Sequence, residues 1–398
     1  MYLNSRIQRV KPSETLAVKT RAMELKAQGR SIVDMAAGEP DIDTPEHIKE
    51  AAVKALRDGK TKYTAVNGIP ELREAIAAKL RDENGLEADA STVIVTNGGK
   101  QAIYSFFDVV LEPGDEVVIP SPYWVSYPVM AEMCGGRSVI VKPRAGAGLK
   151  ITPEDLRASL SPRSKCFVIN SPSNPTGVAY TASELKEFAA VLKDFPNCLI
   201  ISDEVYEKLI FTDVEFVSFA KAAPELANRT VTVNAFSKTY SMTGWRVGYA
   251  SGPKEIIGAM GRHQSQTTSN ICSIAQYAAL AALQGPQDFI REMLSNFTRR
   301  FEIGYKVLES VRGVELLARP DGAFYLFIGI APFLNGAGKG KIKGSAEFAN
   351  FLLEQSGVAV VPGEAFGDDH AFRVSVSSSD DNVRAGFERL EEVMAQFS

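Results

Sequence analysis

The chain has 398 residues, of which 45% are hydrophobic and 23% charged, a length and composition that fit two compact domains better than one. Its 44 basic and 48 acidic residues nearly balance, so the bulk charge favours neither nucleic acid nor an anionic membrane as a partner. The N-terminal stretch lacks the apolar run of a signal peptide, and no later run approaches membrane-spanning length, so we expect a cytoplasmic protein.

Neither the cysteines nor the histidines form a pattern typical of a metal site or a disulfide framework. The four cysteines include no CxxC pair and are predicted to be buried free thiols: Cys134, Cys166, Cys198 and Cys272. The three histidines approach neither a metal site nor a catalytic triad: His47, His263 and His370. We therefore predict no bound metal, and a hydrolase has little support.

The first predicted element is a helix from about residue 14 to Gly29, where a glycine favours the stop. Between roughly residues 46 and 290, short β-branched runs alternate with helical patterns. The predicted strands cover residues 92–96, 116–120, 166–170, 199–202 and 230–233. This alternation is typical of an α/β fold with a mostly parallel, buried sheet and flanking helices, and we predict that it forms one large domain over residues 46–290.

After about residue 290 the pattern changes. A long charged helix precedes three apolar runs, GAFYLFIGI, GVAVVPG and FRVSVS, and a last helix carries apolar residues at helical spacing: Val383, Phe387, Leu390 and Met394. We predict a smaller α+β domain made of residues 291–398 together with an N-terminal arm, residues 1–45. The glycine-rich loop 334–344 lacks the spacing of a phosphate loop and is predicted to be a mobile surface loop.

Polar and aromatic groups follow each predicted strand, at the edge where open parallel sheets bind ligands. The sequences at these strand ends are Asn97-Gly98-Gly99-Lys100, Pro122-Tyr123-Trp124, 171–177 with Asn174, Asp203-Glu204-Val205-Tyr206, and Ser237-Lys238 with Arg246. Taken singly, each has a plain structural explanation, such as a turn, a helix cap, core packing or a surface ion pair. Five strand ends that together offer partners for a phosphate, an aromatic ring and an amine favour a functional site.

These residues resemble fold type I pyridoxal 5′-phosphate (PLP) enzymes, specifically class I aminotransferases of the aspartate aminotransferase type. The resemblance covers nearly the whole chain, and its most specific segments are NSPSNPTG and SKTYSMTGWRVGY. It implies a large PLP-binding domain, a smaller domain that closes on the substrate, and active sites at the interface of a homodimer.

The resemblance assigns the cofactor ring to five residues. Lys238 forms a Schiff base with PLP and shuttles a proton during ping-pong transamination, and Asp203 keeps the pyridine nitrogen protonated. Tyr206 and Asn174 contact the phenolic oxygen, and Trp124 stacks on the ring and borders the substrate. The role of Asp203 has a physical reason, because a cationic ring accepts electrons better than a neutral one.

The cofactor phosphate is assigned to an arginine, a hydroxyl and the backbone at a helix start: Arg246, Ser237, Gly98, Gly99 and Lys100. Many relatives also carry a hydroxyl residue three positions before the lysine, where this chain has Ala235. Tyr63 matches a tyrosine that reaches the phosphate from the other subunit, so a lone subunit is predicted to have an incomplete site.

The α-carboxylate of the substrate is assigned to Arg373, with Asn174 and the backbone of Gly38 beside it. The alternation in FRVSVS places Arg373 on the face opposite the apolar residues. The plain alternative is an interdomain salt bridge. Because Arg373 belongs to the smaller domain, we expect substrate binding to draw the two domains together and exclude water.

The second carboxylate of a dicarboxylic substrate is the least constrained prediction. In the subgroup that the chain resembles, Lys100, Lys11 and Thr15 lie where such a carboxylate could bind. We therefore predict aspartate and 2-oxoglutarate as substrates, with prephenate or aromatic amino acids as the alternative.

Other functions stay open at the level of sequence. The same cofactor site supports β-elimination or decarboxylation. A PLP-sensing transcription regulator needs a DNA-binding module before residue 40, for which there is no room. A nicotinamide dehydrogenase is disfavoured because no GxGxxG motif follows a predicted strand.

Overall fold

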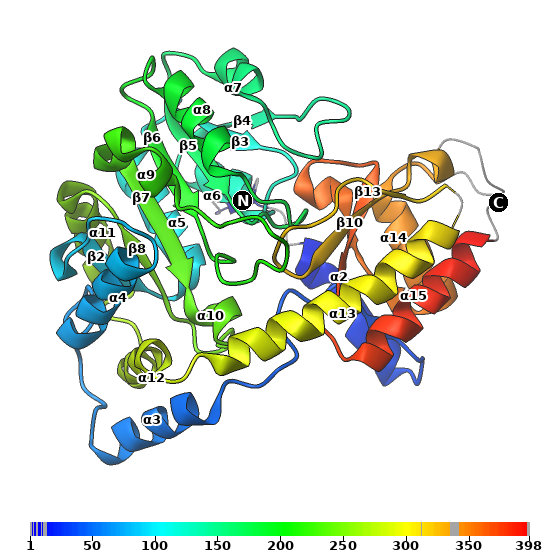
Figure 1. Ribbon diagram of the computed structural model, residues 1–398, viewed down its shortest axis with the longest axis horizontal. Helices are drawn as coiled ribbons and strands as arrows, with labels where there is room; N and C mark the ends of the chain where they lie inside the picture. Colours follow the sequence, from blue (N-terminus) through cyan, green and yellow to red (C-terminus); the bar gives the residue numbers. More distant parts are fainter. Residues whose placement is uncertain are drawn as a thin grey trace.

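The computed structural model describes residues 14–311, 313–334 and 342–395, together with residues 2, 4, 7, 8 and 10. Two groups of elements pack around separate sheets, and the long helix α13 (Asp288–Ser310) runs from one group to the other (Figure 1). The predicted boundary at residue 290 falls inside the first turn of this helix, and the exact domain limits stay a prediction.

The larger group is built on a seven-stranded sheet with the order β2-β8-β7-β6-β5-β3-β4. All pairs are parallel except those of β8, which is antiparallel to both of its neighbours. The strands are β2 (Val93–Thr96), β3 (Glu116–Pro120), β4 (Arg137–Val141), β5 (Ser164–Asn170), β6 (Leu199–Asp203), β7 (Thr230–Ala235) and β8 (Gly248–Ser251). The predicted mostly parallel α/β sheet is confirmed.

Helices cover both faces of this sheet, because successive strand residues point to opposite sides. In β3, Val117 and Ile119 pack against helices on one face, and Val118 packs against those on the other. The helices on the first face are α5 (Gly98–Val110), α6 (Ser126–Met133) and α11 (Lys254–Thr267). Those on the second are α7 (Pro153–Ser159), α8 (Ala182–Leu192) and α9 (Phe219–Ala222), while α3 (Glu46–Arg57), α4 (Pro70–Asp82) and α12 (Ser273–Gln284) pack beside β2.

The smaller group combines a four-stranded sheet, order β12-β13-β10-β9, with the parallel pair β1-β11. Its strands are β1 (Val33–Asp34), β9 (Glu315–Leu316), β10 (Tyr325–Gly329), β11 (Val358–Ala359), β12 (Val361–Pro362) and β13 (Ala371–Ser375). Its helices are α2 (Glu14–Ala27), α13, α14 (Ser345–Ser356) and α15 (Asp380–Met394). All four apolar residues expected on one face of the last helix are buried, which confirms that prediction.

Short 3-10 helices connect several of these elements: η1 (Ala90–Thr92), η2 (Pro224–Arg229), η3 (Ala331–Phe333) and η4 (Gly363–Phe366). Two strands of the large sheet, β4 and β8, were not predicted. β4 is an edge strand that is mostly half-buried, and β8 is only four residues long, so neither shows the continuous apolar run of a central strand. Most of the loop 334–344, residues 335–341, lies outside the described residues.

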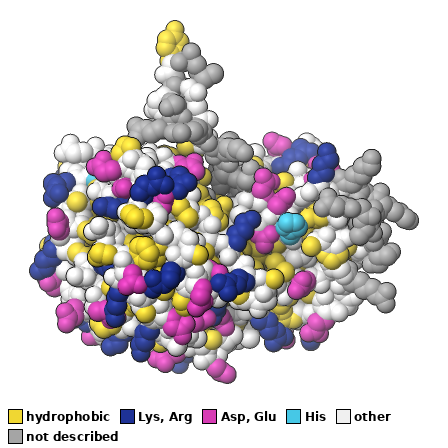
Figure 2. All heavy atoms as spheres, turned by 90° about the horizontal axis from the view of Figure 1, so that it is seen from above, with side chains coloured by type: hydrophobic (Ala, Val, Ile, Leu, Met, Phe, Trp, Pro, Cys, Tyr) yellow, Lys and Arg dark blue, Asp and Glu magenta, His cyan; other side chains and the backbone are white. Residues whose placement is uncertain are grey.

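The surface carries mixed charge. Basic and acidic side chains are interspersed on the face that Figure 2 shows, in line with the nearly balanced composition. None of the helices in the described part of the chain combines the length and the apolar composition that crossing a membrane requires. All four cysteines are free thiols, and three of them are buried as predicted, but Cys272 is exposed because it precedes α12 at the surface.

Candidate active site

A cavity of about 380 Å³ lies between the large sheet and the smaller one. Its size is in the range of small-molecule sites. The carboxyl ends of the parallel strands form one wall, and β10, β13 and the segment after β1 form the other. The cavity brings together most of the predicted site residues: Gly38, Gly99, Lys100, Trp124, Asn174, Asp203, Tyr206, Ser237, Lys238, Arg246 and Arg373.

Lys238 reaches the cavity from α10 (Phe236–Thr239), the short helix that directly follows β7. Its ammonium donates a hydrogen bond to the carbonyl oxygen of Gly38. Burial lowers the pKa of Lys238 to about 8, and the nearby Glu39 carboxylate opposes this shift. A lysine with this pKa is neutral in a much larger fraction of molecules near neutral pH than an exposed one, and only the neutral amine is a nucleophile.

Asp203 ends strand β6 and is 6% exposed. Its Oδ2 accepts a hydrogen bond of 2.5 Å from Oη of Tyr127, and its Oδ1 accepts one of 3.3 Å from the backbone N–H of Val205. Burial raises the pKa of Asp203 to about 6, and the Tyr127 hydrogen bond opposes this rise. A cation placed against this carboxylate would stabilise its ionised form and would itself keep its proton.

Tyr127 was not among the predicted site residues. It lies on α6, where it is 2% exposed, and its ring meets that of Trp124 edge-on at a centroid distance of 5.2 Å. The spacing of three residues places both rings on one side of the helical turn. This spacing in SPYWVSYP was a usable signal for the pair, but the contact with Asp203 depends on how α6 packs.

Tyr206 and Asn174 both line the cavity, and each is hydrogen-bonded to a residue of the smaller sheet. Oη of Tyr206 lies 3.0 Å from Oη of Tyr325 on β10, a further residue that sequence analysis missed. Oδ1 of Asn174 accepts a hydrogen bond of 2.9 Å from Arg373. Burial raises the pKa of the Tyr206 hydroxyl well above its usual value, so this group is a hydrogen-bond donor rather than an anion.

The helix α5 begins beside the guanidinium of Arg246. Gly98 has a φ of +77°, and a Cβ built on it would lie 2.6 Å from Nη2 of Arg246, so only glycine fits at this close approach. The guanidinium donates hydrogen bonds to the carbonyl oxygens of Thr243 and Asn97, at 2.9 and 3.3 Å. A helix N-terminus with an adjacent arginine is suited to bind a phosphate.

Lys100, also on α5, places its ammonium 5.1 Å from the centre of the Trp124 ring. Burial lowers the pKa of Lys100, and the positive charge of Arg246 lowers it further. Ser237 lines the cavity beside Lys238, and so does Ala235, which has no hydroxyl to offer. Gly98 borders Arg246 but does not itself line the cavity.

Arg373 projects from β13 into the cavity and is 2% exposed. Its guanidinium lies 4.3 Å from the ring centre of Tyr325 and 5.0 Å from that of Phe366. Nη2 donates to the carbonyl oxygen of Ala36 at 2.9 Å, while Nε has no hydrogen-bond partner among the described residues. Within the same residues Arg373 has no ion-pair partner, so the alternative of an interdomain salt bridge finds no support.

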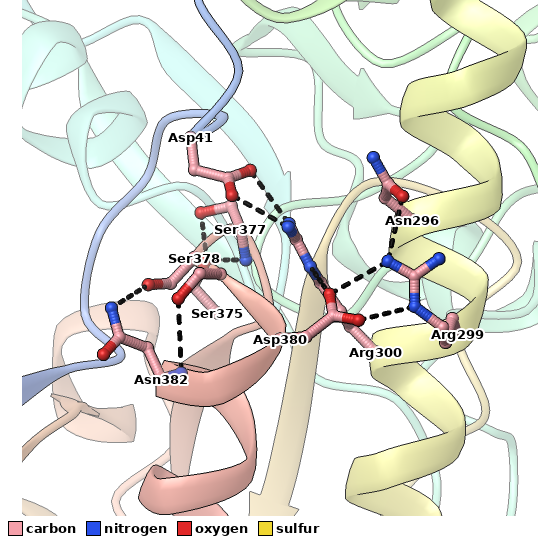
Figure 3. A network of polar contacts seen from close by, with 10 residues as sticks. Asp41, Asn296, Arg299, Arg300, Ser375, Ser377, Ser378, Asp380 and Asn382 are labelled. Atoms are coloured by element: carbon pink, nitrogen blue, oxygen red, sulfur yellow. Dashed lines mark hydrogen bonds and ion pairs between the residues drawn. The ribbon is translucent and has the colours of Figure 1, made fainter.

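The segment that follows β1 lines the cavity and is hydrogen-bonded to helix α13. Asp41 accepts two hydrogen bonds of 2.8 Å from Arg300 on α13, and Nε of Arg300 donates to Asp380 at the start of α15 (Figure 3). A bidentate arginine–carboxylate pair fixes geometry as well as charge. This network therefore helps to hold the segment that carries Gly38 and Glu39, both of which line the cavity.

Of the three remaining predicted residues, only Tyr63 has a described side chain that can be placed relative to the cavity. Tyr63 is 91% exposed and does not line it. Lys11 lies outside the described residues, and Thr15 belongs to α2 but its side chain lies outside them as well.

His263 has two polar partners in the structure. Its Nε2 lies 3.0 Å from Asp108 and its Nδ1 lies 3.1 Å from Oγ of Ser105, an array resembling a Ser-His-Asp triad. The packing of α11 against α5 brings His263 to Ser105 and Asp108, which lie far from it in the chain, so no sequence spacing shows this contact. Ser105 is 0% exposed, however, so no substrate can reach its hydroxyl. No group of three or more potential ligands among the described residues could hold a metal ion.

The groups around the cavity fit the cofactor that the sequence predicts. An amine with a lowered pKa, a buried carboxylate, and a helix start beside an arginine correspond to the aldehyde, the pyridine nitrogen and the phosphate of PLP. The set comes from the ends of separate strands, as binding sites of open α/β sheets do. The individual roles of these residues stay proposals.

Comparison with known proteins points to the same chemistry. A family model described as "Aminotransferase class I and II" matches residues 30–390. The chain is 49% identical over 399 residues to a protein of Cereibacter sphaeroides named "Aspartate/prephenate aminotransferase", with 100% of both covered. A solved structure of the Rhizobium meliloti aspartate aminotransferase aligns with a TM-score of 0.95 and 41% identity, covering 100% of this chain and 99% of that one. The Thermus thermophilus aspartate aminotransferase with maleate aligns with a TM-score of 0.92 and 42% identity, covering 99% and 100%.

The fold, the composition of the cavity and these similarities lead to one conclusion. The match to the family model spans most of the chain, and the relatives are similar over their whole length. The chain belongs to the class I and II aminotransferase family and is a PLP-dependent transaminase, which transfers amino groups between amino acids and 2-oxo acids.

Proposed function

We propose that this transaminase acts on dicarboxylic substrates and transfers the amino group of aspartate to 2-oxoglutarate. The observation that carries the proposal is the surplus of cations on the cavity wall. Arg373 and Arg246 suit the substrate α-carboxylate and the cofactor phosphate, and Lys100 remains to bind a second carboxylate. The names of the similar proteins from Cereibacter sphaeroides and Rhizobium meliloti support the choice of aspartate.

Each residue contributes through an ordinary property of its side chain. PLP, when bound, supplies an electron sink for the negative charge that develops at the substrate Cα. Lys238 would anchor the cofactor through its amine, and the same amine would move the proton from Cα. Asp203 holds a proton on the ring nitrogen, because an ionised carboxylate in a buried site stabilises an adjacent cation.

Other groups orient the reactants. Tyr206 and Asn174 would hold the phenolic oxygen of the cofactor by hydrogen bonds, and Trp124 would support its ring. Arg373 clamps the α-carboxylate through two parallel hydrogen bonds, with Gly38 alongside. Because Arg373 comes from the smaller sheet and Lys238 from the larger one, movement of the two groups together would exclude water from the reacting atoms.

Prephenate is the second candidate substrate. The protein from Cereibacter sphaeroides, which is similar over its whole length, carries prephenate in its name. Prephenate also bears a second carboxylate, so it can use the same cations. Aromatic amino acids share the longer body but lack that group.

The test is to measure kcat/KM for aspartate, prephenate, phenylalanine and alanine, with 2-oxoglutarate as the amino acceptor where an amino acid is the donor and glutamate as the donor for prephenate. We expect kcat/KM for aspartate or prephenate to exceed that for alanine by at least about tenfold, which is the gain from one added charge-assisted hydrogen bond. A preference for alanine would contradict the proposal. Analysis of the products separates amino transfer from β-elimination or decarboxylation.

We further propose that the enzyme is a cytoplasmic homodimer in which Tyr63 reaches the phosphate site of the neighbouring subunit. The exposure of Tyr63, 91%, supports this, as do the exposed apolar side chains of Val53 and Leu56 on the nearby helix α3. Light scattering gives the mass in solution, and mixing Tyr63→Phe subunits with Lys238→Ala subunits tests whether sites are shared. Cell fractionation tests the location.

A further inference from the structure

Lys19 is a charged residue of the cavity wall that the proposed roles leave unused. It lies on α2 and lines the cavity, and its ammonium is 3.5 Å from Oε1 of Glu39. The side chains of both residues are about half exposed, at 49% and 48%. An ion pair this open to water holds its partners weakly.

Glu39 does not depend on Lys19 as its only partner. Its Oε2 accepts a hydrogen bond of 2.9 Å from the hydroxyl of Thr243, which lies five residues after Lys238. This hydrogen bond and the charge of Lys19 hold the pKa of Glu39 below its usual value, in spite of partial burial. Release of Lys19 would therefore leave Glu39 ionised and still hydrogen-bonded.

The backbone of Lys19 is fixed although its side chain is free to move. Ala22 and Leu25, one to two turns further along α2, are buried in a cluster with residues of the smaller sheet and η4. Arg21 also pairs with Glu354 of α14 at 2.9 Å. Helix α2 therefore belongs to the same body as Arg373, and only the flexible stem of Lys19 needs to rearrange to reach a ligand.

Among the residues that the structure describes, five basic side chains line the cavity, namely Lys19, Lys100, Lys238, Arg246 and Arg373. The proposed function uses the last three for the cofactor and the α-carboxylate, and Lys100 for the second carboxylate. Lys19 is left, and among the described residues the ammonium of Lys100 contacts the face of Trp124 rather than a carboxylate. A ligand with a second carboxylate would meet both cations inside a closing cavity, where charge pairs are strengthened by the loss of water.

We propose that Lys19 is a specificity-determining residue, whose ammonium leaves Glu39 and, together with Lys100, binds the second carboxylate of a dicarboxylic substrate. This inference rests on the proposed function, because it assigns a further residue to that substrate class. A monocarboxylic ligand has no second carboxylate with which Lys19 could pair after leaving Glu39. Movement of Lys19 therefore favours the binding of dicarboxylic ligands only.

The test compares Lys19→Met with Lys26→Met, a control that removes an exposed charge from the same helix outside the cavity. Dissociation constants of the PLP-loaded proteins are measured from the change in cofactor absorbance on adding maleate, a dicarboxylate without an amino group, or 3-phenylpropionate, a monocarboxylate. We expect Lys19→Met to bind maleate about tenfold more weakly and 3-phenylpropionate within about twofold of the wild type. Lys26→Met should match the wild type for both.

A second comparison separates direct binding from an effect through Glu39. The loss of maleate affinity caused by Lys19→Met is measured again in a Glu39→Gln background, and we expect it to persist. Its disappearance would show that Lys19 acts only by holding Glu39, and would overturn the inference.

The outcomes also distinguish the two levels of the proposal. Wild-type protein that prefers aspartate and maleate, with Lys19→Met unchanged for maleate, would overturn the role of Lys19 alone. Wild-type protein that binds maleate no better than 3-phenylpropionate and prefers alanine would overturn the dicarboxylic function, and the role of Lys19 with it.

Discussion

The two walls of the cavity are built in different ways. On the large-sheet wall, the key side chains lie at or just after the ends of parallel strands, since Asp203 is the last residue of β6 and Lys238 follows β7. On the opposite wall, Arg373 lies within a strand and Gly38 lies in the segment after β1, held through Asp41 by Arg300. The first wall suits a tightly held cofactor, and the second suits a substrate that must enter and leave.

This difference predicts which constant each substitution changes. Variants of the large-sheet wall should alter the chemistry and the cofactor, whereas variants of the small-sheet wall should alter substrate affinity. The variants below test the comparison in order of decreasing expected effect.

Asp203→Asn should have the largest effect. An amide cannot stabilise a proton on the ring nitrogen as a carboxylate does, so we expect kcat to fall at least about a hundredfold. The matched control is Glu204→Gln. Glu204 is the adjacent buried carboxylate, but it accepts hydrogen bonds from Ser202 and Ser218 and does not line the cavity. Similar activity of the Asp203 and Glu204 variants in stopped-flow measurements would remove the distinction between the two carboxylates.

Asp203→Asn should also stabilise the cofactor-free protein against unfolding. Burial raises the pKa of Asp203 from 3.8 to about 6, so between these values the folded chain keeps a proton that the unfolded chain has released. Stability is therefore lost as the pH rises through this window, and Asp203→Asn avoids the loss. Above pH 6 we expect the variant to gain up to about 3 kcal/mol in the free energy of unfolding, with no gain below pH 3.8. Urea denaturation of the cofactor-free proteins at several pH values measures this, and equal stability above the window would contradict it.

Arg373→Lys should act on the substrate and spare the cofactor. A lysine keeps the charge but cannot make two parallel hydrogen bonds to a carboxylate, so we expect kcat/KM for aspartate to fall by about tenfold to a hundredfold. The cofactor absorbance and its dissociation constant should stay at the wild-type values. Loss of cofactor in this variant would break the proposed division between the walls.

Tyr127→Phe, a variant of the large-sheet wall, should have the smallest effect. The Tyr127 hydrogen bond lowers the pKa of Asp203, so its removal should raise that pKa and move the acidic limb of the pH–rate profile upward. We also expect the cofactor dissociation constant to rise by about threefold to tenfold. Tyr180→Phe, at a buried tyrosine outside the cavity, is the control. An unchanged acidic limb would show that Tyr127 does not influence Asp203.

The same comparison explains what the sequence could predict. Lys238, Asp203 and the glycines at the start of α5 were predictable, because each lies at or shortly after the carboxyl end of a strand. The contact of Tyr127 with Asp203 spans 76 residues of sequence and that of Tyr206 with Tyr325 spans 119, so both depend on how separate elements pack. No local pattern encodes such distances.

The fold shows the same limit. Long central strands such as β5 and β6 were predicted within a few residues, because buried strands form continuous apolar runs. The short strand β8 was missed, and its first residue, Gly248, is explained only by the tertiary structure. A Cβ at Gly248 would lie 2.5 Å from the backbone of Gly98, the residue at the start of α5.

The central claim is that Lys238 carries the cofactor in this cavity. Reduction of the PLP-loaded enzyme with borohydride, followed by digestion and mass spectrometry, measures directly which lysine is joined to the cofactor. We predict a pyridoxyl label on the peptide that contains Lys238, and no such peptide from Lys238→Ala. A label recovered on Lys100 or Lys19 instead would contradict the account.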